Sequence, residues 1–105
     1  MDETRFDEIA REELARIEDK LEEVDPDEVE VTSSDGVLTL ELRDGVKVIV
    51  NSHRAARQIW MAAVASAWHF SYDESDGRWR TANAEELRGT LSGLIAERIG
   101  LVLVL

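Results

Sequence analysis

The sequence contains no cysteine, a single proline and only two histidines. The lack of cysteine excludes disulfide bonds, thiolate metal sites and thiol nucleophiles. Two histidines cannot form a structural zinc site on their own. Long hydrophobic runs are also lacking, and the apolar stretch at residues 101–105 is far too short to span a bilayer. The chain is therefore restricted to non-covalent packing and to metal sites without thiolate ligands.

The size and composition of the chain fit a single domain spanning residues 1–105. With 105 residues and 44% hydrophobic residues, it can build one modest core and no second one. The first ten residues are acidic and lack the apolar segment of a secretory signal. We therefore expect a compact cytoplasmic protein.

Negative charge is concentrated at the start of the chain. Residues 1–30 hold fourteen of the twenty-three acids against four bases, so they account for -10 of the formal net charge of -11. Such a field attracts multivalent cations and basic protein surfaces, and it repels nucleic acids and anionic membranes. We expect the function to lie in this segment, with neither a nucleic acid nor a membrane as partner.

The same segment has the periodicity of an amphipathic helix. Apolar residues recur at steps of three and four from Phe6 to Val24, which predicts a helix over about residues 4–24 that Pro26 terminates. Because the apolar stripe must face a core, acids line up on the outside at i, i+4 spacing. Like charges at this spacing destabilise a helix by about 0.2 to 0.5 kcal/mol per pair.

From Glu28 onward the period changes to two. Alternation and turn residues predict antiparallel strands over residues 28–32, 37–42, 46–51, 57–63 and 67–72, with a short sixth strand around Trp79. A second helix is predicted to open at Asn83 with Glu86 completing a capping box, and to end at Gly100. The predicted fold class is α+β, a two-layer sandwich with two helices packed on one face of a single antiparallel sheet. The apolar tail, residues 101–105, is expected to lie in a groove between or beside the helices.

The clustered carboxylates are the candidate metal ligands. Carboxylate oxygens are hard ligands that suit iron, manganese, magnesium or calcium. On an exposed ridge they would bind an ion weakly and exchange it fast, which suits delivery or sensing of iron better than catalysis. The alternative is a solvated helix face that confers solubility. The seven candidate ligands are Glu18, Asp19, Glu22, Glu23, Asp25, Glu28 and Glu30.

Several segments, in order along nearly the whole chain, resemble the frataxin family and specifically its bacterial branch, CyaY. They are residues 17–25, Asp35-Gly36 with the following strand, Asp44-Gly45, residues 58–62, Trp68-His69-Phe70 and the lone Trp79. The resemblance implies a frataxin-like α-β(5-6)-α fold and a non-enzymatic role. The chain departs from the family at residues 51–55, where His53 and Ala55 stand in place of the usual glutamine and proline.

The resemblance also implies a function and partners. It implies an iron-binding accessory of iron-sulfur cluster assembly that holds Fe2+ or Fe3+ weakly, or other divalent cations, and that modulates the cysteine desulfurase. The implied partners are the cysteine desulfurase and the scaffold protein. The implied partner-binding residues are Glu18, Asp19 and Glu22 on the helix, with Asn51, Gln58 and an exposed Trp60 on the sheet face.

Two other functions remain open alternatives. One is a ferroxidase or iron-storage oligomer, and the other is a metal-independent acidic docking module for basic proteins. The chain is expected to be a monomer, with iron-induced oligomers as the alternative state. No serine, aspartate or second histidine accompanies His53 or His69 in a catalytic pattern, so no enzymatic site is expected.

Overall fold

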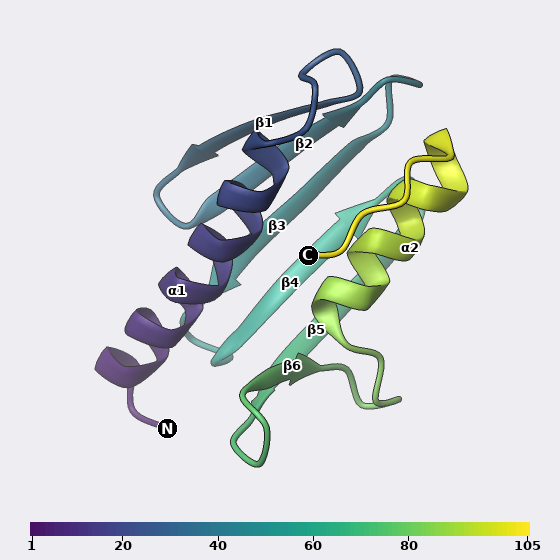
Figure 1. Cartoon of the computed structure of the whole chain (residues 1–105). Helices are drawn as coiled ribbons and strands as arrows, with labels where there is room; N and C mark the ends of the chain where they lie inside the picture. The colour runs from purple at the N-terminus through teal and green to yellow at the C-terminus, as the bar shows by residue number, and fades with distance from the viewer.

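Two helices and six strands form the computed structural model, which describes residues 1–105. Neighbouring strands pair antiparallel, and the strand order in the sheet follows the chain order from β1 to β6. Both helices cover the same face of the sheet (Figure 1). The predicted two-layer fold is thereby confirmed. The elements are α1 (Glu3–Glu22), β1 (Val29–Ser34), β2 (Val37–Leu42), β3 (Lys47–His53), β4 (Gln58–Ala63), β5 (Ser66–Asp73), β6 (Arg78–Arg80) and α2 (Leu87–Ile99).

The core is one cluster of 21 buried apolar residues between the two layers. Every second residue of the central strands points into it, which is the consequence of the alternation seen in the sequence. The apolar stripe of α1 is buried as predicted, with Phe6, Ala10, Leu14, Ile17 and Leu21 all in the core. No helix of the structure is both long and apolar enough to cross a membrane.

The helix boundaries differ from the predicted ones in one instructive case. Helix α2 begins at Leu87, several residues later than predicted, because Ala84 adopts a left-handed conformation with φ of 66°. Glu86 is the N-cap itself: its carboxylate accepts hydrogen bonds from the backbone N–H groups of Arg88 and Gly89. The predicted capping box opening at Asn83 is therefore wrong. The predicted end at Gly100 is confirmed by its left-handed φ of 70°.

The apolar tail returns along the helix layer. Its end lies between α1 and α2 in Figure 1. Leu105 is buried, and Leu101 and Leu103 pack against the core, whereas Val102 and Val104 are exposed. The predicted burial is thus confirmed for the three leucines only, because an extended segment presents alternate side chains to opposite sides.

The turn between β1 and β2 yields a first stability prediction. Asp35 and Gly36 both have positive φ, 47° and 79°, as a two-residue hairpin turn of the primed type requires. We expect Gly36→Ala to lower the free energy of unfolding by about 1 to 2 kcal/mol, because a side chain is strained in this region. Urea unfolding measures the change.

Gly93→Ala is the matched control for this substitution. Gly93 lies within α2 with no atom within 4 Å of an added Cβ, so alanine there should stabilise the protein by about 0.5 to 1 kcal/mol. An added Cβ at Gly36 would lie 2.8 Å from Ser52 Oγ. Partial recovery in Gly36→Ala/Ser52→Ala would therefore assign part of the cost to this contact. Equal effects of alanine at Gly36 and Gly93 would contradict the prediction.

Candidate functional site

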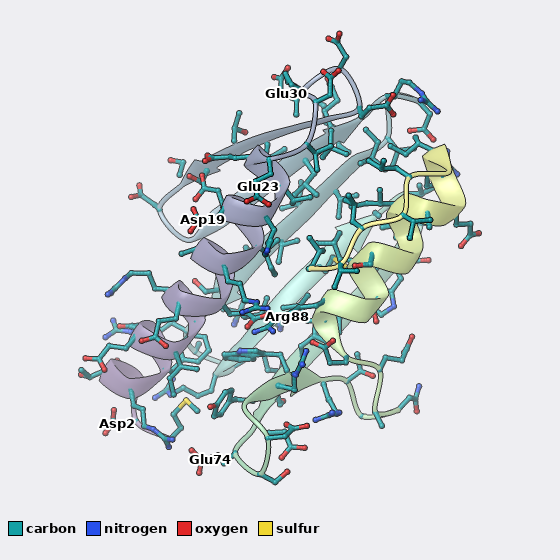
Figure 2. The ribbon with its side chains drawn as sticks, in the orientation of Figure 1. Asp2, Asp19, Glu23, Glu30, Glu74 and Arg88 are labelled. Carbon is teal, nitrogen blue, oxygen red and sulfur yellow. The ribbon has the colours of Figure 1, made fainter.

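The candidate site is an acidic ridge, defined as Glu18, Asp19, Glu22, Glu23, Asp25, Glu28 and Glu30. These residues lie on the C-terminal part of α1, on the loop after it and on β1, which is an edge strand of the sheet. In Figure 2, Asp19 and Glu23 project from the C-terminal half of α1 and Glu30 lies beyond them, while Asp2 and Glu74 lie at the opposite end of the molecule. The fold thus places the seven predicted ligands along one edge.

Most of the ridge carboxylates have no cationic partner. Between residues 18 and 30 there are eight acids and one lysine. Five of the seven ridge residues are exposed and make no ion pair within the chain. They are Asp19, Glu22, Glu23, Asp25 and Glu30. The ridge therefore presents uncompensated negative charge to solvent.

The other two ridge residues are held by neighbours. Both carboxylate oxygens of Glu28 accept hydrogen bonds from Arg43, at 2.8 and 2.7 Å, and Arg43 also donates to the Ile99 carbonyl at 3.0 Å. One oxygen of Glu18 accepts a bond of 2.7 Å from the Ser33 hydroxyl. An iron ion would have to displace Arg43 to use Glu28 fully, so Glu28 is the weakest candidate of the seven.

The ridge is an open surface and not a preformed metal cage. No three histidine, aspartate or glutamate side chains converge closely enough to hold an ion without moving. Exposed glutamate and aspartate side chains can rotate to share an ion, but ordering them costs conformational entropy. The arrangement therefore fits weak, exchangeable binding of a cargo ion.

Several acids elsewhere on the surface have partners within the chain. Glu3 and Asp7, at the start of α1, pair with Arg54 at 3.1 and 3.3 Å. A hydrogen bond from Ser75 lowers the pKa of Asp73, and one from Arg80 lowers the pKa of Asp76. These partners distinguish such acids from the exposed carboxylates at the end of α1 and on β1, which make no ion pair.

The outer face of the sheet carries the other predicted contact residues. Strand alternation places Gln58 and Trp60 on this face and buries Ile59 and Met61, as predicted. Trp60 is half-buried rather than exposed, which corrects the prediction. Its indole ring is stacked between two imidazoles, described below, and these cover both of its faces.

The two imidazoles belong to His53 on β3 and His69 on β5. Their ring centroids lie 3.7 and 4.2 Å from that of Trp60, with interplanar angles of 16° and 10°. His69 is directly opposite Trp60 in the register of β4 and β5. Sequence reasoning missed this stack, because only a correct strand register could have revealed it.

Comparison with known proteins identifies the family. Residues 1–101 match the frataxin-like domain, Frataxin_Cyay. The iron-sulfur cluster assembly protein CyaY of Dechloromonas aromatica is 40% identical over 105 residues, covering 100% of this chain and 99% of that protein. The protein of the same name from Ralstonia pickettii is 41% identical over 103 residues, covering 93% and 89%.

Solved structures agree with these matches. Frataxin from Psychromonas ingrahamii superposes with a TM-score of 0.89 and 26% identity over 98% of this chain and 96% of that one. Trimeric yeast frataxin, complexed with ferrous iron, gives a TM-score of 0.74 and 29% identity over 89% and 87%. The family matches confirm the prediction that the chain is not an enzyme. The chain belongs to the frataxin family, in its bacterial CyaY branch.

Proposed function

We propose that this protein is an iron-binding accessory of iron-sulfur cluster assembly that acts as an iron donor or sensor in the cytoplasm. It binds Fe2+ or Fe3+ weakly on the acidic ridge and docks the same ridge on a basic face of the cysteine desulfurase. The bacterial relatives are named as cluster assembly proteins, and the yeast relative was solved with ferrous iron. Both facts support the proposal.

The observation that carries the proposal is the row of uncompensated carboxylates. Iron and a basic protein surface need the same oxygens of Asp19, Glu22 and Glu23, so each changes the affinity of the other. This coupling is how a weakly bound ion would modulate the desulfurase as iron availability changes. The outer sheet face, with Asn51, Gln58 and Trp60, supplies a second contact to the desulfurase and scaffold assembly.

Reversing two ridge charges tests the proposal. We expect Asp19→Lys/Glu23→Lys to weaken binding of both Fe2+ and the desulfurase at least tenfold, which corresponds to about 1.4 kcal/mol. Neither side chain makes a contact that the fold needs, and a lysine at the C-terminal end of α1 is favourable to the helix dipole. Anaerobic calorimetry measures both affinities, and thermal unfolding checks that the fold is kept.

Glu8→Lys/Glu85→Lys is the matched control for this variant. It makes the same change in net charge at two exposed acids, of which Glu8 lies ten residues before Glu18 on α1 and Glu85 precedes α2. We expect it to leave both affinities within about twofold because exposed charges beyond about 10 Å are screened. Equal losses in the two variants would contradict a localised ridge. Loss of desulfurase binding with unchanged iron binding would favour the metal-independent docking module.

The ferroxidase alternative makes a different demand on the structure. It needs carboxylates held in a sheltered bridging site. Glu13 is the only buried acid, and Arg88 already occupies both of its oxygens. We therefore expect the protein to consume no more oxygen than free Fe2+ does, and to keep the mass of a monomer in excess iron. Faster oxygen consumption or a larger mass would favour the ferroxidase or iron-storage alternative over the proposed function.

A further inference from the structure

The His53, Trp60 and His69 rings form one continuous stack across β3, β4 and β5. Both faces of the indole are covered, so a binding partner can reach the indole only at its exposed edge. The edge of Trp60 is also fixed, because its Nε1–H donates to Gln58 Oε1 at 2.9 Å. Gln58 is held in turn by donating from Nε2 to Ser71 Oγ at 3.2 Å. The orientation of the indole is thus fixed by the two stacked imidazoles and by the side-chain amide of Gln58.

The orientation of His53 depends on its protonation state. Its Nδ1 accepts a hydrogen bond of 3.3 Å from the Ala56 backbone N–H in the loop between β3 and β4. An imidazole can accept only where it carries no proton, and the imidazolium form donates from both nitrogens. Protonation of this nitrogen therefore removes the bond that anchors His53 to the loop.

We propose that His53 and His69 are positioning residues that hold Trp60 edge-on for docking, and that protonation of the pair weakens that docking. The inference rests on the proposed function, because it takes the occupant of this face to be the desulfurase and scaffold assembly. Two imidazolium groups would place charge beside the Trp60 edge, and covering this charge on docking costs free energy. They would also loosen the loop bond of His53.

Other charges near the stack are already paired. On the His53 side, Arg54 and Arg57 of the same loop pair with Glu3 and Asp7 of α1. On the His69 side, Arg80 of β6 lies opposite Ser71 and pairs with Asp73 and Asp76. Around the stack itself, Asn51, Gln58 and Ser71 are uncharged. The two imidazoles are therefore the ionisable groups at this spot that no ion pair engages.

Trp60 fluorescence tests the stack in the free protein. A neighbouring imidazolium quenches indole emission more strongly than a neutral imidazole. We expect emission to fall between pH 8 and pH 5.5, and the fall to disappear in both Trp60→Phe and His53→Phe/His69→Phe, which keep the buried Trp79 and the partly buried Trp68. Identical pH profiles in the parent protein and these variants would overturn the stack as a proton-sensitive unit, whatever the partner.

Docking on the purified desulfurase tests the positioning role. His53→Phe/His69→Phe keeps two stacked rings that cannot titrate, so it reports how pH alters the partner itself. We expect the ratio of Kd at pH 6 to Kd at pH 8 to be at least threefold larger for the parent protein than for this variant. His53→Ala/His69→Ala, which frees the indole, should bind at least fivefold more weakly at pH 8.

The possible failures are distinguishable. Equal Kd ratios in the parent protein and the phenylalanine variant would overturn the proton effect. Unchanged affinity of the alanine variant at pH 8 would overturn the positioning role. If the parent protein does not bind the desulfurase at any pH, the proposed function fails and the docking role falls with it, while the fluorescence result still decides whether the stack responds to protons.

Discussion

Glu13→Ala is expected to lower the free energy of unfolding by about 3 to 5 kcal/mol. The Glu13 side chain is 5% exposed and accepts two bonds from Arg88, at 2.9 and 2.7 Å, while the Arg88 side chain is 15% exposed. Figure 2 shows Arg88 between the two helices. The hydrogen bond that Arg88 donates to Glu13 raises the pKa of Arg88, so the guanidinium stays charged. Without Glu13 it would remain a largely buried charge with no side-chain hydrogen-bond partner.

The loss should appear as a large shift in thermal stability. For a domain of this size, each kcal/mol changes Tm by about 4 to 8 °C, so we expect a decrease of more than about 12 °C by calorimetry. Two controls separate pairing from packing. Glu13→Met/Arg88→Leu should be within about 1 kcal/mol of the parent protein or more stable. Asp44→Asn removes the exposed pair with Arg98 and should cost less than about 1 kcal/mol. A Glu13→Ala effect no larger than that of Asp44→Asn would contradict the argument.

The Glu13 and Arg88 pair also shows where sequence reasoning ends. Periodicity along α1 was enough to predict which residues are buried, because each position in a helix has a fixed direction relative to its neighbours. It could not predict a buried acid, since Arg88 is 75 residues away in the sequence. The same limit applies to Glu28, whose partner Arg43 lies on the connection between β2 and β3.

The strands were predictable for a related reason. Alternation and Asp-Gly turns fixed the pairing of neighbouring strands, since a meander needs only local turns. The start of α2 was not predictable in this way. The left-handed conformation of Ala84 and the hydrogen bond from the Thr81 N–H to the Glu85 carbonyl delay the helix, and alanine gives no sign of such a conformation in a sequence.

The candidate site was predictable where it depends on one element and not where it joins several. The ridge follows from acids at i, i+4 spacing on α1, continued on the next strand. The stack around Trp60 joins three strands, and its members are 7 and 9 residues from Trp60 along the chain. Local patterns indicated that Trp60 faces outward, and only the register showed what covers it.

Deleting the tail, residues 101–105, is expected to lower the free energy of unfolding by about 2 to 5 kcal/mol. Full burial of a leucine side chain contributes about 1.5 to 3 kcal/mol. Leu105 is 8% exposed, and Leu101 and Leu103 are partly buried against the same core. Because the total stability of a small domain is about 5 to 15 kcal/mol, this loss is a large fraction of it.

The alternation of the tail supplies a control of matched length. Leu103→Ser/Leu105→Ser should reproduce most of the loss caused by the deletion. Val102→Ser/Val104→Ser changes two side chains that are 82% and 89% exposed, so it should alter stability by less than about 0.5 kcal/mol. Urea unfolding of the three variants measures these differences. Equal losses in the leucine and valine variants would mean that the tail stabilises the protein through its backbone, and not by packing its leucine side chains against the core between α1 and α2.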